Sequence, residues 1–380
     1  MSALVSLDGR EIRLRALATA HSHAFQRAMR GRAQRGGAAP EDFWSWRRVM
    51  YEIARSLTPE SIRAVSRVAF RELFLAGVRT VGEFHYVHHQ NGGEPYDERT
   101  ILSDAVIQAA RDEGLRIALL RVAYHRAGPG RLAEPDQLRF CDATVDDVLR
   151  DVDALRVRYA GAPDVRIGVA PHSVRAVPPS WLPELSAYAD LHGLPFHMHV
   201  AEQEREVLEC VAETGKRPVE LLDELGVLGP RFVAVHATSL LPHEARLLGD
   251  AGSFACICAT TERDLGDGLP DITALREAGA RLCTGVDSHV VTDPFEELRS
   301  LETHERLRTR RRVTFHGERT PAEQLWHEGS LAGALACGFE DAGGHVVLDG
   351  GHPSLALVDR EHLLDAVVFG GGPSLVLRVC

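Results

Sequence analysis

The chain has 380 residues, enough for one large α/β barrel or for two ordinary domains. Its net charge of −11 disfavours nucleic acid as a partner, because phosphate binding needs a basic face. No apolar run is long enough to span a membrane and no secretory leader is recognisable, so we expect a cytoplasmic protein without membrane association. The seven cysteines form no CxxC pair, which argues against a zinc ribbon or a disulfide framework.

In chain order, residues 1–15 form a predicted β-hairpin with Asp8-Gly9 as its turn, and Ala16 then begins the first apolar strand. Seven further short apolar segments follow, separated by longer segments of helical character. The predicted strands after the first are residues 78–86, 116–125, 165–172, 195–201, 232–238, 254–260 and 281–287. The predicted helices are residues 59–76, 103–113, 145–159, 179–192, 219–225, 242–251 and 272–278.

Eight β–α alternations predict the α/β class and, within it, a (β/α)8 TIM-like barrel over residues 16–338. A doubly wound sheet is the alternative, but no Gly-x-Gly-x-x-Gly follows any predicted strand. After Gly338 the helical period is lost, and residues 344–351 and 354–359 have the pattern of strands and turns. We expect residues 339–380 to pair with residues 1–15 in a small, reduced β-sandwich beside the barrel.

Histidines and carboxylates gather at the ends of four predicted strands. Residues two apart on a strand point to the same side, so His21 and His23 direct two imidazoles at one point, which suits Zn²⁺ or a similar metal. Taken alone, such a pair is more often a packed or solvated coincidence. Because a barrel gathers the carboxyl ends of its strands, the other ends complete the set. They supply His197, His199 and Glu202 from the fifth strand, His236 from the sixth and Asp287 from the eighth.

This set of strand-end residues resembles the amidohydrolase superfamily, in its mononuclear deaminase branch. Binuclear members generally bridge two metals through a carboxylated lysine on the fourth strand, whereas the only lysine here, Lys216, follows the fifth. A narrower resemblance, over residues 20–310, is to the formimidoylglutamate deiminases of histidine degradation. It is carried by Phe43-Trp-Ser-Trp-Arg-Arg, Glu83-Phe-His-Tyr-Val-His-His, His172-Ser-Val-Arg-Ala-Val, Leu265-Gly-Asp-Gly and Val286-Asp-Ser-His.

The resemblance implies one divalent metal, either Zn²⁺ or else Fe²⁺ or another ion, with a coordination position left open for water. His197 shares a strand face with His199, but the His-x-x-Glu spacing favours His199 as the ligand. The expected ligands are His21, His23, His199 and Asp287. The metal would lower the pKa of the water, Asp287 and His236 would accept its proton, and Glu202 would protonate the imino nitrogen that leaves as ammonia.

The implied substrate is N-formimino-L-glutamate, a small dicarboxylate that would be hydrolysed to N-formyl-L-glutamate and ammonia. An acidic protein needs a local positive pocket for its two carboxylates, and the resemblance points to Arg175 and Arg47. Gln26, Tyr86 and His172 are expected to add hydrogen bonds. Relatives commonly form homodimers, and we expect a homodimer here.

Two other functions are compatible with parts of the pattern. Another mononuclear deaminase could act on a purine, pyrimidine or triazine ring, but such a ring would not require two arginines in the pocket. A barrel without catalytic activity, used for assembly or for metal storage, would have no need for all the ligands together with Glu202 and His236. The sequence therefore favours the deiminase.

Overall fold

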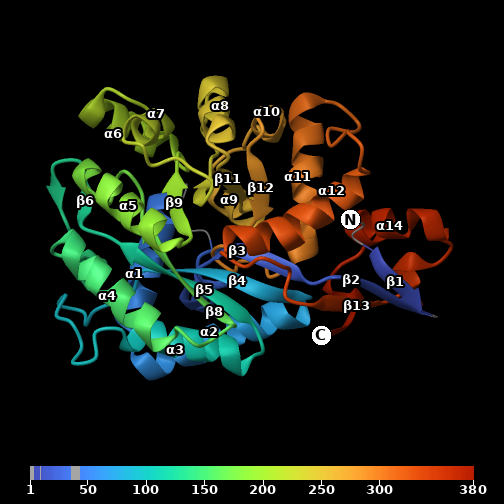
Figure 1. The fold of residues 1–380 in the computed structure, drawn as a ribbon, viewed down its shortest axis with the longest axis horizontal. Coiled ribbons are helices and arrows are strands. Elements are labelled where there is room, and N and C mark those ends of the chain that lie inside the picture. Colours follow the sequence, from blue (N-terminus) through green and yellow to red (C-terminus); the bar gives the residue numbers. More distant parts are fainter. Residues whose placement is uncertain (1–3, 9, 36–42) are drawn as a thin grey trace.

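The computed structural model describes residues 4–8, 10–35 and 43–380, and its centre is an eight-stranded parallel sheet (Figure 1). The strands are β3 (Leu17–Ser22), β4 (Val78–His85), β5 (Arg116–Ala123), β8 (Val165–Pro171), β9 (Phe196–Val200), β10 (Phe232–His236), β11 (Phe254–Ile257) and β12 (Arg281–Thr284). Neighbours follow the order β12-β11-β10-β9-β8-β5-β4-β3. The ring closes where Asp287 N donates to His21 O at 3.1 Å and His23 N donates to Asp287 O at 2.9 Å. The predicted (β/α)8 barrel is confirmed.

The strands are buried on both faces, which explains their nearly continuous apolar character. All five residues of β9 and of β10 are buried. One face of each strand fills the interior of the barrel and the other packs against the surrounding helices. The polar residues of these strands therefore stand out, because water is excluded on either side.

The helices that match predicted segments are α2 (Pro59–Leu75), α3 (Ile101–Asp112), α4 (Val145–Arg158), α5 (Leu182–His192), α7 (Pro218–Glu224), α8 (Pro242–Asp250) and α10 (Ile272–Glu277). The start of α2 shows why such boundaries are readable. Pro59 occupies the first turn, and the Thr58 side chain accepts a hydrogen bond from Ser61 N.

Further helices were not predicted: α1 (Phe43–Arg55), α6 (Glu204–Thr214), α9 (Ala259–Leu265), α11 (Pro294–Thr309), α12 (Pro321–His327) and α13 (Gly333–Ala336). A π-helix (Glu328–Ala332) joins α12 to α13. Residues 254–260 were predicted as the seventh strand. The observed strand, β11, ends at Ile257, and helix α9 begins at Ala259, inside the predicted segment. Helix α11 buries Glu297, Glu302 and Glu305, so its buried face does not look apolar in the sequence.

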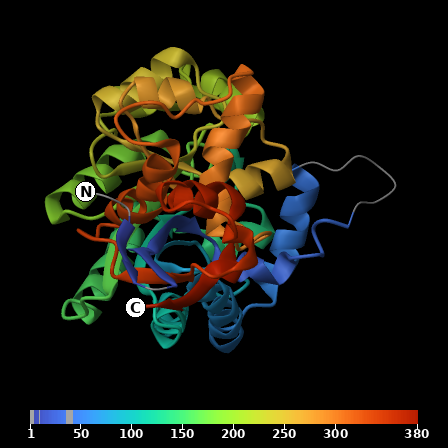
Figure 2. The same ribbon diagram turned by 90° about the vertical axis from the view of Figure 1, so that its right-hand side faces the viewer.

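The terminal segments lie together beside the barrel, at the right of Figure 1 and towards the viewer in Figure 2. They form one antiparallel sheet in the order β1-β2-β13-β14, with β1 (Leu4–Asp8), β2 (Glu11–Arg15), β13 (His345–Asp349) and β14 (Val376–Val379). The two terminal segments pair as expected. A sandwich needs two packed sheets, however, and the described residues of the termini form a single sheet. Of the predicted Asp8-Gly9 turn, Gly9 lies outside the described residues.

The segment 354–359 was expected to contain strand and turn, and the structure shows turns but no strand there. Pro353–Leu355 is a short 3-10 turn, and Leu357 has a φ of 64°, which no strand residue adopts. Helix α14 (Leu363–Gly370) follows, although the sequence pattern had indicated the loss of helices after Gly338. Among the described residues, no helix is both long enough and apolar enough to span a lipid bilayer.

Candidate metal centre and active site

Four side chains from β3, β9 and the end of β12 converge at the carboxyl end of the barrel. His21 Nε2 lies 3.2 Å from His23 Nε2 and 3.2 Å from His199 Nε2. Asp287 Oδ1 lies 3.4 Å from His21 Nε2 and 3.2 Å from His23 Nε2. Two ligand atoms that share a tetrahedral Zn²⁺ lie roughly 3.3–3.4 Å apart, from bonds of about 2.0–2.1 Å. The distances from His21 to the other three predicted ligands, and from His23 to Asp287, are therefore those expected around a single metal ion.

The ring nitrogens away from this point are held by backbone carbonyls. His23 Nδ1 donates to Phe84 O at 2.9 Å, and His199 Nδ1 donates to His172 O at 3.0 Å. Each bond fixes the tautomer in which Nε2 carries the free lone pair. Both rings are thus oriented as ligands by the backbone of the neighbouring strand.

The electrostatics of the cluster suit a cation. Burial lowers the pKa of His21 to about 3 and also lowers the pKa of His23 and His199, so the three rings are neutral. Burial alone would raise the pKa of Asp287, but the hydrogen bond from His21 and the nearby histidines hold it below its usual range. Three neutral imidazoles beside one carboxylate are the donor set that divalent zinc or iron binds.

A hydrogen-bonded clamp behind the ligands joins the ends of three strands. Ser22 Oγ donates to Glu83 Oε2 at 2.6 Å and accepts from His289 Nε2 at 2.8 Å. Glu83 Oε1 accepts from Ala24 N at 2.8 Å. Because Ser22 lies between His21 and His23, the clamp holds the His-x-His segment against the strand that carries Asp287.

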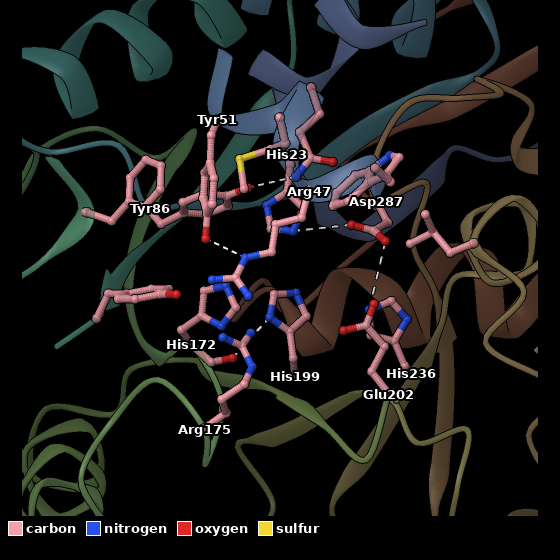
Figure 3. A pocket seen from close by; sticks show the side chains of 16 residues that line it. His23, Arg47, Tyr51, Tyr86, His172, Arg175, His199, Glu202, His236 and Asp287 are labelled. Carbon is pink, nitrogen blue, oxygen red and sulfur yellow. Dashed lines mark hydrogen bonds and ion pairs between the residues drawn. The ribbon is translucent and has the colours of Figure 1, made fainter. Parts of the chain in front are cut away.

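Glu202 and His236 flank the four candidate metal ligands. His236 Nε2 lies 3.7 Å from Glu202 Oε1 and 3.8 Å from Asp287 Oδ2. Burial raises the pKa of Glu202. Burial would lower the pKa of His236, but Glu202, Glu262 and Asp287 surround the ring and raise it to about 10. Two groups that can hold and pass protons thus face the same point as Asp287 (Figure 3).

The opposite wall of the pocket is polar and cationic. Arg175 is only 8% exposed, and its Nη1 is buried with no hydrogen-bond partner among the described residues. Arg47, from α1, donates through Nε to the hydroxyl of Tyr51. Gln26 Nε2 donates to the Tyr86 hydroxyl at 2.8 Å, while its Oε1 is buried without a partner among the residues described. This wall can receive an anionic ligand that also carries N–H groups.

The structure brings all the predicted site residues together. Those that line the pocket are His23, Gln26, Arg47, Tyr86, His172, Arg175, His199, Glu202, His236 and Asp287, and His21 lies behind them in the metal cluster. Figure 3 shows the side chains of Arg47 and Arg175 approaching the metal side from opposite directions. His197 is not among them: its Nε2 donates to Ala336 O at 2.8 Å, so it packs deeper in the barrel.

Several pocket residues received no role in the sequence reasoning, although Trp46 and Leu265 stand in motifs that it quoted. They are Trp46, Met50, Tyr51, Tyr124, Phe140 and Leu265, mostly aromatic side chains on α1 and in loops. Aromatic residues in such positions look the same as core residues in a sequence. Glu262 was also missed, although it comes directly after the seventh strand and the strand-end rule could have found it.

Comparison with known proteins gives a consistent result. The sequence profile of the amidohydrolase family matches residues 16–369. A formimidoylglutamate deiminase of Pseudomonas aeruginosa is 37% identical, over 94% of this chain and 81% of that protein. An 8-oxoguanine deaminase of the same organism is 29% identical, over 98% of this chain and 79% of that protein.

A solved structure has the same fold over nearly the whole chain. The crystal structure of an amidohydrolase from Brucella melitensis superimposes with a TM-score of 0.89 and is 35% identical. The match covers 97% of this chain and 82% of that one.

Proposed function

The chain belongs to the amidohydrolase family, and from this premise we propose that it hydrolyses N-formimino-L-glutamate to N-formyl-L-glutamate and ammonia. The observation that carries the substrate is the buried Arg175, which lines the same pocket as the metal ligands and whose Nη1 has no partner among the described residues. Burying a guanidinium group with an unsatisfied donor is costly. A substrate carboxylate removes that cost.

The metal is proposed to be Zn²⁺, with Fe²⁺ as the alternative, held by His21, His23, His199 and Asp287. Such an ion is a Lewis acid that lets water act as a nucleophile near neutral pH. Its fit rests on the 3.2–3.4 Å spacing of the ligand atoms and on the carbonyl bonds that turn two imidazoles towards them.

The remaining side chains bind the substrate and move protons. Arg175 and Arg47 hold the two carboxylates, and Gln26 Oε1 accepts an N–H of the formimino group. Asp287 takes the proton of the attacking water, and His236, whose Nε2 lies 3.8 Å from Asp287 Oδ2, orients that water. Glu202, whose pKa is raised by burial, gives a proton to the imino nitrogen. Water adds to the formimino carbon, the bond from that carbon to the imino nitrogen breaks, and ammonia and the N-formyl product remain.

The decisive experiment incubates the zinc-loaded protein with N-formimino-L-glutamate and measures ammonia and N-formyl-L-glutamate together. Equal amounts of the two products support the proposal. Formamide with glutamate would show hydrolysis of the other C–N bond. Guanine, cytosine and 8-oxoguanine are assayed alongside. If any of them releases ammonia faster than N-formimino-L-glutamate does, the protein is a ring deaminase instead.

Location and assembly are part of the proposal. All seven cysteines are free thiols, which suits a reducing compartment such as the cytoplasm. A homodimer stays a prediction, and light scattering of the purified protein tests it.

A further inference from the structure

Glu262 is a buried carboxylate beside the active site to which the proposed reaction gives no part. It lies on α9, directly after β11, and is only 2% exposed. Its Oε1 accepts a hydrogen bond from Cys258 N at 2.9 Å and lies 3.3 Å from His236 Nδ1. A carboxylate enclosed in the protein and aimed at an active-site imidazole orients that ring.

His236 is placed between two sets of carboxylates. Its Nδ1 faces Glu262, and its Nε2 faces Glu202 at 3.7 Å and Asp287 at 3.8 Å. When Nδ1–H donates to Glu262, the atom presented to the reacting groups is Nε2. We propose that Glu262 is the positioning residue that fixes the orientation of His236 and holds a proton on its Nδ1.

The local backbone shows why the orientation of the His236 ring depends on a side chain from another element. His236 and Ala237 have φ angles of 72° and 52°, in the left-handed region that residues other than glycine rarely occupy. His236 is the last residue of β10 and still pairs with Val200, so the ladder holds its backbone but not the rotation of the ring. The His236 ring stacks on the His199 ring, with 5.4 Å between centroids and 15° between planes. Stacking fixes the plane of the ring but not which nitrogen faces the pocket, and Glu262 makes that choice.

The same geometry also places one atom of each of His236, Cys258 and Glu262 within 4.8 Å of one another, as a second metal site would. The Glu262 oxygen already accepts the Cys258 backbone N–H, which favours a hydrogen-bonding role. A count of bound metal distinguishes the two roles.

The experiment rests on the proposed function and compares Glu262→Met and Glu262→Gln with the wild-type zinc protein. Methionine removes the acceptor, whereas glutamine keeps an oxygen for both N–H groups. We expect Glu262→Met to lower kcat by about 10- to 100-fold, as the loss of such an orienting partner does. Glutamine restores most of kcat, and KM stays within about twofold in both variants because Arg175 and Arg47 are untouched. Zinc content stays at one per chain.

The matched control is Glu297→Met. Glu297, on α11, is also buried, and it accepts hydrogen bonds from Thr260 N and Oγ1 on the same helix α9. Among the described residues it makes no hydrogen bond or ion pair with His236. It reports the effect of removing a buried carboxylate from this region. We expect its kcat to stay within about twofold of wild type, while its melting temperature falls as far as that of Glu262→Met.

A spectroscopic measurement is independent of the substrate. In the zinc-loaded wild-type protein, nitrogen NMR of labelled histidine should show His236 with a proton on Nδ1 in a hydrogen bond to a carboxylate. This signal should persist in Glu297→Met and change in Glu262→Met. An Nδ1 without a proton in the wild-type protein overturns the proposal, even if neither methionine variant folds.

The other outcomes are also decisive. A folded Glu262→Met with wild-type kcat, or equal losses of kcat in Glu262→Met and Glu297→Met, would leave Glu262 with a structural role only. A second equivalent of zinc in the wild-type protein, lost in Glu262→Met, would make it a ligand. If the wild-type protein releases no ammonia from formiminoglutamate, the proposed function fails, and the NMR result still judges the role of Glu262.

Discussion

At the carboxyl end of the barrel Asp287 is buried and Glu202 partly buried among histidines, whereas near the amino end Glu328 is buried beside Gln324. Glu328 lies in the π-helix and lines a hollow with Arg281, the first residue of β12. Gln324, four residues earlier, donates to Glu328 Oε1. Burial raises the pKa of Glu328 to about 7.

The partners of the buried groups differ in their distance along the chain. The partner of Glu328 comes from one helical turn away, as in ordinary local packing. Asp287 contacts His21 and His23, which lie more than 250 residues earlier in the chain. The pocket also retains buried donors and acceptors without partners among the described residues, such as Arg175 Nη1. Buried polar groups that converge from distant strands and remain partly unsatisfied indicate a site, whereas locally satisfied ones indicate structure. Substitutions at the two ends should therefore fail in different ways.

The largest effect is expected for Asp287→Ala. Removing the only carboxylate from the four ligands should abolish zinc retention, and activity should fall to background. Elemental analysis of the dialysed protein, together with the ammonia assay, measures both. A variant that keeps stoichiometric zinc would exclude Asp287 from the ligand set.

Glu202→Gln should separate chemistry from metal binding. Glutamine cannot donate an acidic proton, so kcat should fall by about 10²- to 10⁴-fold, the range typical of general acid–base groups. Zinc content should equal that of the wild-type protein, because Glu202 is not among the four ligands. Near-normal turnover would remove Glu202 as the proton donor.

Arg175→Met tests the cationic wall of the pocket at the carboxyl end of the barrel. Hydrogen bonds to charged groups contribute about 1.5–3 kcal/mol, so kcat/KM for the dicarboxylate should fall by roughly 10- to 150-fold. Lysine should restore only part of this loss, because it lacks the planar fork of arginine. Unchanged kcat/KM in Arg175→Met would reject the carboxylate contact.

At the amino end, Glu328→Gln should leave kcat unchanged and alter only the pH dependence of stability. The folded pKa of about 7 lies above the ordinary value of 4.5, so the unfolded chain releases this proton first. Wild-type stability is therefore lost as pH rises from about 4.5 to about 7, by at most about 3 kcal/mol. Melting curves of both proteins should agree near pH 4.5 and diverge above it, with glutamine the more stable. Parallel curves would show that Glu328 is ionised in the fold.

Much of the barrel was predictable because its indications are local. Val78, Arg116 and Arg281 begin strands where apolar runs begin. The carboxyl ends were predicted too long, as at 254–260, because site residues there leave the strand ladder while still buried. Helix α11 was missed since its buried face carries glutamates, which are satisfied by partners such as Thr273 and Thr314 that a sequence pattern cannot identify.

The identities of the candidate ligands were determined by the sequence, because strand periodicity directs His21 and His23 to one side and the barrel places strand ends together. The His-x-x-Glu spacing also favoured His199 over His197, and the tertiary structure supplied the reason: the two share a strand face, but His197 donates to Ala336 O deeper in the barrel. The tertiary structure alone decided that Glu262 contacts His236 and that Arg175 retains a donor without a partner. These interactions join residues that are distant along the chain. Their energies depend on burial and on interatomic distance, which are defined only once the protein has folded.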